Sequence, residues 1–122
     1  MDVVIHNLNE NKIAEIISDE IIINNLQDAL DLIANISYQE INKIILKENN
    51  ITSDFYKLKT GLLGEILQKC VNYNIQIAIV GNFEKYKSKS LRAFIIESNK
   101  GNQFFFVSDI SKAKQMLIKT YK

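Results

Sequence analysis

Runs of apolar residues predict five short strands along this chain. Residues 3–8 and 13–17 flank a polar, Asn-rich segment, and two such runs across a short loop are typical of an antiparallel hairpin. Three further runs of β-branched or aromatic side chains lie at residues 43–47, 75–80 and 104–107. Side chains of these kinds favour strands. The apolar pattern therefore predicts a sheet that begins with a hairpin.

Apolar residues three or four positions apart predict a helix after each later strand and one after the hairpin. An asparagine at position 24 or 25 caps the first helix. The second is expected to be a long helix that extends from a cap at residues 52–54 to residue 73. The third begins between residues 84 and 90, and residue 108 or 109 caps the last.

The resulting order of elements, β-β-α-β-α-β-α-β-α, predicts the α/β class. Strands separated by single helices pair in parallel through right-handed crossovers, so only the first strand is expected to run antiparallel. The 122 residues contain no linker, repeat or low-complexity segment. We therefore expect one domain over residues 1–122 with a single mixed sheet of five strands.

Polar residues on one face of the predicted sheet affect where the helices are expected to pack. Lys43 and Lys47 share a face of the third strand, whereas a sheet covered on both faces is apolar throughout. We therefore expect the helices mainly on the other face. An open apolar stripe is typical of an interface. The pattern predicts a weak homodimer or a bound protein partner on the stripe of Ile45, Ala78, Phe105 and Val107.

Composition excludes several classes of partner. The chain has 15 basic and 14 acidic side chains, so neither nucleic acid nor an anionic membrane surface is an expected partner. The apolar runs are too short to span a membrane, and the first residues lack the pattern of a signal peptide. The single cysteine, Cys70, favours a reducing, cytoplasmic location.

Patterns typical of catalysis or metal binding are absent from the sequence. His6 is the only histidine, and no Ser or Cys lies near it in a nucleophile context. One His and one Cys do not supply the usual ligands of zinc, and no phosphate-binding glycine motif occurs. Glu48 and Asp54 are interpreted as parts of a polar loop that leads into a helix cap. We expect no cofactor and no metal, and the sequence favours a protein that is not an enzyme.

A basic segment at residues 86–92 is a candidate anion site at the expected start of the third helix. It combines lysines, the hydroxyls of Ser88 and Ser90, and the only arginine, Arg92. Helix N-termini present free N–H groups to anions, and a guanidinium binds phosphate or carboxylate through two parallel hydrogen bonds. One alternative is a solvated basic turn with Ser88 or Ser90 as the helix cap. Another is that Arg92 pairs with an acidic neighbour such as Glu48 or Asp54.

Two glycines interrupt the predicted second helix. Gly61 and Gly64 lie where a glycine costs about 1 kcal/mol relative to alanine. They therefore predict a close approach by another segment, either within the monomer or from a partner.

The element order resembles the STAS-like fold of bacterial anti-anti-sigma factors, where a strand pair leads into successive strand–helix units. Those factors carry a phosphorylatable hydroxyl directly before a Gly-Leu pair. Residues 58–62 (Leu-Lys-Thr-Gly-Leu) keep the hydroxyl, the glycine and the leucine, although Thr replaces Ser and the family's Asp is missing. The resemblance implies that Thr60 is a candidate phosphorylation site, near the surface in the first half of the second helix.

A second resemblance extends over nearly the whole chain. The sequence is similar to the bacterial family called domain of unknown function 4180 at residues 18–20, 27–32, 58–61, 64–69, 78–81 and 88–92. This resemblance implies a family but no activity.

The leading functional hypothesis is a non-enzymatic regulatory or protein-partner-binding domain of STAS-like fold. The alternative is a domain that binds a small molecule or anion, or a modest enzyme, at the C-terminal ends of the parallel strands, where open α/β sheets commonly bind ligands. Thr60 is the candidate regulatory residue. The candidate contacts with a ligand or partner are Gly61, Glu48, Asn49, Asn50, Gly81, Asn82, Ser88, Ser90 and Arg92.

Overall fold

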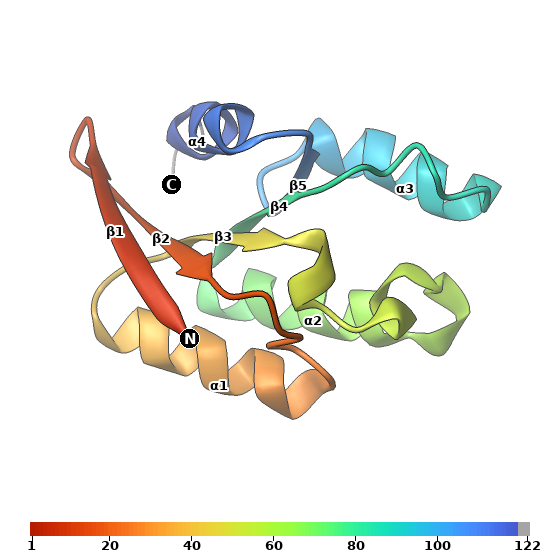
Figure 1. Ribbon diagram of the computed structural model, residues 1–122, viewed down its shortest axis with the longest axis horizontal. Helices are drawn as coiled ribbons and strands as arrows, with labels where there is room; N and C mark the ends of the chain where they lie inside the picture. Colours follow the sequence, from red (N-terminus) through yellow and green to blue (C-terminus); the bar gives the residue numbers. More distant parts are fainter. Residues whose placement is uncertain (120–122) are drawn as a thin grey trace.

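One five-stranded sheet lies at the centre of the computed structural model, which describes residues 1–119 (Figure 1). The strands follow the same order along the sheet as along the chain. β1 pairs antiparallel with β2, and each later pair is parallel, as the sequence predicts. The strands are β1 (Asp2–Leu8), β2 (Asn11–Ile17), β3 (Lys43–Lys47), β4 (Gln76–Val80) and β5 (Phe104–Val107). The helices are α1 (Leu26–Tyr38), α2 (Leu62–Tyr73), α3 (Lys89–Asn99) and α4 (Ile110–Ile118).

The β1–β2 hairpin closes through a two-residue turn. Asn9 and Glu10 have φ angles of 50° and 69°. Two consecutive positive φ angles are typical of a type I′ turn, whose twist matches that of the flanking strands. The turn is shorter than the expected polar loop, because Asn11 and Lys12 already pair with β1.

Side-chain caps begin three of the helices where the sequence predicts them. The side chains of Asn25, Ser88 and Asp109 each accept a hydrogen bond from the backbone N–H three residues later, at 2.8, 3.2 and 2.8 Å. Each cap gives a partner to an N–H group that has none within its helix.

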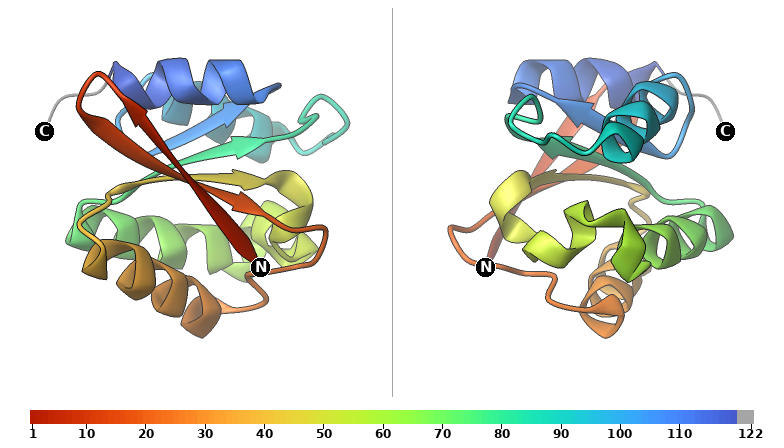
Figure 2. Two further views of the ribbon diagram at one scale, coloured as in Figure 1. Left: turned by 60° about the vertical axis from the view of Figure 1, so that its left-hand side comes forward. Right: turned by 90° about the vertical axis from the view of Figure 1, so that its right-hand side faces the viewer.

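Helices cover both faces of the sheet (Figure 2). α1, α2 and α3 pack on one face, and α4 packs on the other through Ala113 and Leu117. Beneath α4, the side chains of Ile45, Ala78 and Phe105 are at most 1% exposed. The predicted open stripe is therefore wrong, because α4 already covers it.

Buried polar side chains explain why this face resembled a solvated one. Lys43 and Gln76 are 5% and 0% exposed. Lys43 Nζ donates to Gln76 Oε1, and Gln76 Nε2 donates to the carbonyl of Asn102 at 2.9 Å. Because polar groups with hydrogen-bond partners can lie in a core, their position in a strand did not mark a surface. Val107, the fourth residue of the predicted stripe, is half-buried and packs against the buried residues beneath α4.

The second helix is shorter than the sequence predicts. Ser53–Tyr56 and Leu58–Thr60 form 3-10 turns, and α2 begins only at Leu62. Gly61 separates these parts with a φ of +83°, a left-handed conformation that an α-helix excludes. Apolar spacing continues across the break because 3-10 turns also place every third residue on one side.

The glycines of this region do not mark a close approach by another segment of the described chain. A β-carbon added at Gly61 or Gly64 meets no heavy atom within 4 Å. The prediction of tight packing within the monomer is therefore wrong, and Gly61 is explained by its backbone conformation instead.

Candidate functional site

The connections after β4 and β5 leave the sheet on opposite faces. α3, which follows β4, packs through Leu91 on the face shared with α1 and α2, whereas α4 follows β5 onto the other face. The crossovers from β2 to β5 all advance in one direction along the sheet, so their helices share a face. Ligands of open α/β sheets bind beyond the carboxyl ends of strands, where such connections diverge. The topology therefore points to a crevice beyond β4 and β5.

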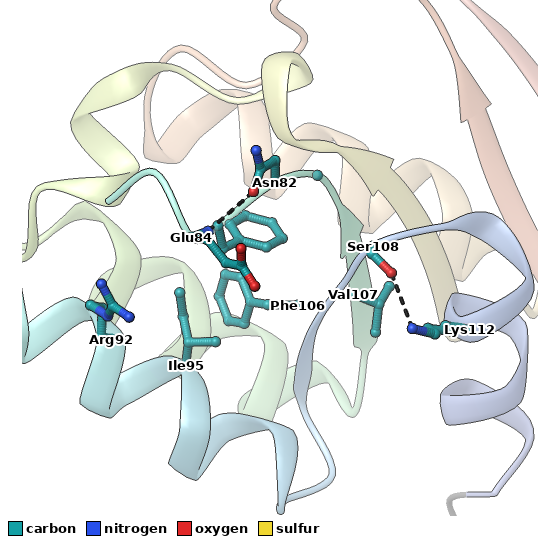
Figure 3. Close-up of a pocket in the computed structure, with 10 residues that line it drawn as sticks. Asn82, Glu84, Arg92, Ile95, Phe106, Val107, Ser108 and Lys112 are labelled. Atoms are coloured by element: carbon teal, nitrogen blue, oxygen red, sulfur yellow. Dashed lines mark hydrogen bonds between the residues drawn. The ribbon is translucent and has the colours of Figure 1, made fainter. Parts of the chain in front are cut away.

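A cavity of about 760 Å³ occupies this crevice (Figure 3). Its volume lies within the range of small-molecule sites. The apolar part of the lining is Phe83, Ile95, Phe106 and Val107. The remaining lining is Gly81, Asn82, Glu84, Arg92, Ser108 and Lys112.

Two cationic side chains line the crevice from different helices. Arg92 lies in the first turn of α3 and Lys112 in the first turn of α4, on opposite sides of the opening (Figure 3). Lys112 Nζ donates to the hydroxyl of Ser108 at 3.3 Å. The guanidinium of Arg92 forms no ion pair or side-chain hydrogen bond with any residue of the described range 1–119. The lining thus has two cations and one carboxylate, that of Glu84.

The structural alternative for Arg92 is wrong. Glu48 pairs with Lys85 at 2.7 Å, and the carboxylate of Asp54 lies 4.0 Å from Lys57 Nζ. Both acids therefore have lysine partners, and the guanidinium remains available to the crevice.

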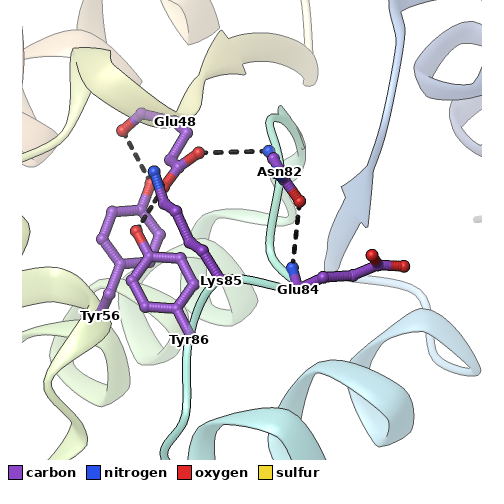
Figure 4. Close-up of polar contacts among 6 residues, drawn as sticks. All are labelled: Glu48, Tyr56, Asn82, Glu84, Lys85 and Tyr86. Atoms are coloured by element: carbon purple, nitrogen blue, oxygen red, sulfur yellow. Dashed lines mark hydrogen bonds and ion pairs between the residues drawn. The ribbon is translucent and has the colours of Figure 1, made fainter.

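Glu48, at the end of β3, holds the segment that follows β4 (Figure 4). Its Oε1 accepts a hydrogen bond from the backbone N–H of Asn82 at 3.2 Å. Its Oε2 pairs with Lys85 and accepts a hydrogen bond from the Tyr86 hydroxyl. Gly81 permits this contact, because a β-carbon there would lie 2.6 Å from Glu48 Cβ. One wall of the crevice is thereby fixed to the sheet.

Two stacked tyrosines complete the cluster around Glu48. The rings of Tyr56 and Tyr86 have centroids 5.2 Å apart, and the Tyr56 hydroxyl donates to the Glu48 carbonyl at 2.8 Å. Burial raises the pKa of Tyr56, and Tyr86 and Glu48 raise it further. Burial also raises the pKa of Tyr86, as does its hydrogen bond to Glu48. Both phenols thus stay protonated as donors, and the cluster supports the wall.

Asn50, one of the predicted contacts, has a structural role. It is fully buried, and its Oδ1 accepts a hydrogen bond from the N–H of Lys47 at 2.9 Å. Its Nδ2 donates to the carbonyls of Ser18 and Glu20, both at 2.9 Å. The side chain therefore fixes the connection between β2 and α1 and cannot contact a ligand.

Three further predicted residues line other hollows. Asn49 lines a cleft of about 740 Å³ that also includes Glu48 and Gly81. Ser88 and Ser90 line a third cavity, of about 420 Å³, beside the 3-10 turns. The structure therefore brings Gly81, Asn82 and Arg92 together and separates the two serines from them.

Thr60 lies on the surface in the turn before α2, so its predicted position within a helix is wrong. Its hydroxyl lies 2.8 Å from the carbonyl of Asp54 and 2.9 Å from that of Lys57. The same oxygen accepts a hydrogen bond from the N–H of Leu62 at 3.3 Å. The hydroxyl therefore organises the start of α2.

His6 and Cys70 lie apart from the crevice. The His6 Nε2 atom lies 2.7 Å from Glu15 Oε1 across the hairpin. Cys70 is fully buried, and burial raises the pKa of its thiol to about 12. Over residues 1–119, no group of three or more His, Cys, Asp or Glu side chains is placed to hold a metal. No helix of that range has both the length and the apolar composition needed to cross a membrane.

Sequence reasoning missed most of the crevice lining. Glu84 and Ser108 follow neighbouring parallel strands, whose carboxyl ends lie at the same end of the sheet. Their positions shortly after these strands are a signal that could have identified them as lining residues. Lys112 carries no such signal, because its position depends on the face that α4 covers. The missed residues are Phe83, Glu84, Ile95, Phe106, Val107, Ser108 and Lys112.

The fold and crevice together define a single-sheet α/β domain with a candidate small-molecule site at its strand ends. A family model described as Domain of unknown function (DUF4180) matches residues 8–117. The chain belongs to this family, as the sequence resemblance implied. Comparisons with curated proteins and with solved structures find no match. The resemblance to STAS-like domains stays a prediction.

Proposed function

We propose that this protein binds a small anionic organic molecule in the crevice beyond β4 and β5. The observation that carries the proposal is the position of Arg92, whose guanidinium lines the crevice and has no ion-pair partner within residues 1–119. Lys112 supplies a second cation from α4. Arginine is the side chain best suited to hold a carboxylate or phosphate through two hydrogen bonds.

The lining also favours a particular ligand class. Phe83 and Phe106 meet edge to face, with centroids 5.2 Å apart, and Ile95 and Val107 extend this apolar surface. A ligand with one anionic group and an apolar or aromatic body fits such a surface. The carboxylate of Glu84 disfavours polyphosphates, because like charges repel.

Binding, rather than catalysis, is supported by the cluster beside the crevice. Glu48 is occupied by Lys85, Tyr86 and the Asn82 N–H. A carboxylate with these partners is not free to act as a general base. The proposed activity is therefore reversible binding of a metabolite.

Thermal unfolding in the presence of defined anions tests this function. The probes are benzoate and phenyl phosphate, with acetate and inorganic phosphate as partners that lack the apolar body. We expect an aromatic probe to raise the melting temperature of the wild type, because a ligand at 100 times its Kd stabilises by about 2.7 kcal/mol. Arg92→Lys keeps the charge but loses the paired hydrogen bonds of the guanidinium, so it should lose this shift. Lys100→Ala removes a charge just beyond the far end of α3 and should keep the shift.

Two results overturn the proposal. One is a wild type that none of the four anions stabilises. The other is an Arg92→Lys variant that responds as the wild type does.

Phosphorylation-dependent regulation is a second candidate function. The surface position of Thr60 favours it, since a kinase can reach an exposed turn. The sheet face on which a partner was expected is covered by α4, so the regulatory hypothesis ranks second to ligand binding. Mass spectrometry of the protein from its native cell should find phosphate on Thr60, and a fully unmodified Thr60 under all growth conditions contradicts the candidate.

A further inference from the structure

The two edges of the sheet differ in whether a further strand can pair with them. α3 closes the β5 edge, because Asn99 Nδ2 donates to the carbonyl of Phe106 at 3.1 Å and Asn99 Oδ1 accepts from the N–H of Phe106 at 2.8 Å. The hydroxyl of Ser98 donates to the carbonyl of Phe104 at 2.8 Å. The carbonyls of Phe104 and Phe106 and the N–H of Phe106 are thus occupied by side chains of the same domain.

The β1 edge is open by comparison. β1 lies at the outside of the sheet (Figure 2), and within residues 1–119 no side chain hydrogen-bonds to its backbone. Its seven residues include no Lys and no Pro, the residues that commonly protect an edge. Val3, Val4 and Ile5 are 36%, 44% and 37% exposed. An edge strand of this length and composition is a template for pairing.

We propose that β1 pairs antiparallel with β1 of a second copy of this chain and forms a two-fold dimer with a continuous sheet. The pairing is centred on Val4, which lies opposite the partner's Val4. Val3 then lies opposite the partner's Ile5 on the other face of the strands. At each end, the carboxylate of Asp2 lies opposite the imidazole of the partner's His6.

Self-complementarity identifies the occupant as a second copy. In the proposed register every apolar residue of β1 from Val3 to Ile5 meets an apolar residue, and an acid meets an imidazole. Centring the pairing on Ile5 instead would place Val4 opposite the partner's His6 and Val3 opposite the partner's Asn7. Because the β5 edge is closed, assembly ends at two copies, as an isologous contact requires. This surface is separate from the crevice.

Sedimentation velocity over a range of concentrations tests the dimer. We expect the wild type to change from monomer to dimer as its concentration rises. Val4→Lys places two ammonium groups opposite each other and should weaken association by about tenfold or more. A mixture of Val4→Lys and Val4→Glu should recover the dimer. Ile96→Lys is the matched control, since Ile96 is 58% exposed on α3, and it should associate as the wild type does.

Disulfide trapping tests the register. Residues directly opposite in antiparallel strands have Cα atoms about 4.5–5.5 Å apart, a distance that a disulfide spans. Oxidised Val4→Cys should therefore form a covalent dimer, and Asn7→Cys, which meets no copy of itself in this register, should not. A wild type that stays monomeric at high micromolar concentration, an unchanged Kd in Val4→Lys, or equal trapping by both cysteine variants overturns the proposal.

Discussion

Gly81 lies against Glu48 so closely that its missing side chain is a requirement of the fold. A β-carbon at this position would lie 2.6 Å from both Cβ and Oε1 of Glu48. Glu48 Cβ is next to the backbone, so β3 and the segment after β4 must separate to relieve the contact. We expect Gly81→Ala to lower the free energy of unfolding by about 1–3 kcal/mol.

Gly64→Ala is the matched control for this substitution. Gly64 lies in α2 with open space around the site of its β-carbon. Alanine there should raise stability by about 0.5–1 kcal/mol, because glycine loses more backbone freedom on folding. Urea unfolding of both variants measures these opposite changes, and equal losses would contradict the steric explanation for Gly81.

Tyr56 should make the protein sensitive to alkaline pH. Its pKa is raised in the folded state, first by burial and then by Tyr86 and Glu48. The unfolded chain therefore releases the phenolic proton first. The stability that Tyr56 contributes through this difference in pKa is complete below about pH 10. Above that pH the free energy of unfolding falls by about 1.4 kcal/mol per pH unit. Urea midpoints measured between neutral and alkaline pH should fall more steeply for the wild type than for Tyr56→Phe, and parallel curves would contradict this assignment.

Cys70 should be unreactive in the folded protein. Burial raises the pKa of its thiol to about 12, and the thiolate is the reactive form. A coloured thiol reagent should therefore modify Cys70 only as fast as the fold opens, and denaturant should make the reaction rapid. Rapid modification of the native protein at neutral pH would show that α2 opens readily.

The beginning of α2 depends on the left-handed conformation of Gly61. A residue with a β-carbon costs about 1–2 kcal/mol in this region, and Asn less than most. Gly61→Ala should therefore lower stability by about that amount, with Gly61→Asn between it and the wild type in thermal unfolding. If Gly61→Ala were neutral, the 3-10 turn and α2 would have to merge easily into the longer helix that the apolar spacing predicts.

Local chemistry explains which elements could be predicted. Asn25 and Asp109 cap helices within three residues of themselves, and the parallel pairings follow from the alternation of strands and helices. Apolar spacing does not reveal the left-handed conformation of Gly61, because 3-10 turns also place every third residue on one side. The break before α2 therefore could not be predicted from this spacing. Whether α4 packs on one face of the sheet or the other is determined neither by the sequence of α4 nor by that of β4, so the burial of Ala78 beneath it could not be predicted. The position of Lys112 depends on the same packing, which is why it was missed. Arg92 was found because it is the only arginine and lies at an expected helix start.

The closed β5 edge should limit the size of any assembly. Asn99 satisfies both backbone groups of Phe106, so Asn99→Ala removes two hydrogen bonds and should cost about 1–3 kcal/mol. It also opens a second sheet edge, which permits open-ended growth. Light scattering should therefore detect species larger than a dimer in Asn99→Ala, and not in Lys100→Ala. A variant that is destabilised but never larger than the wild type assembly would show that the edge is protected in another way.

The identical order of the strands in the chain and in the sheet has a consequence for synthesis. Each strand pairs with the strand that left the ribosome just before it, so the sheet can grow in one direction as the chain emerges. Such sequential neighbours also keep sequence separation between contacts low, which favours fast folding. The face that includes Ile13, Ile45 and Ala78 is different, because its cover, α4, is the last helix of the described chain to emerge. A nascent chain that pauses before α4 therefore exposes an apolar sheet face, and this is the stage at which a chaperone has most to bind.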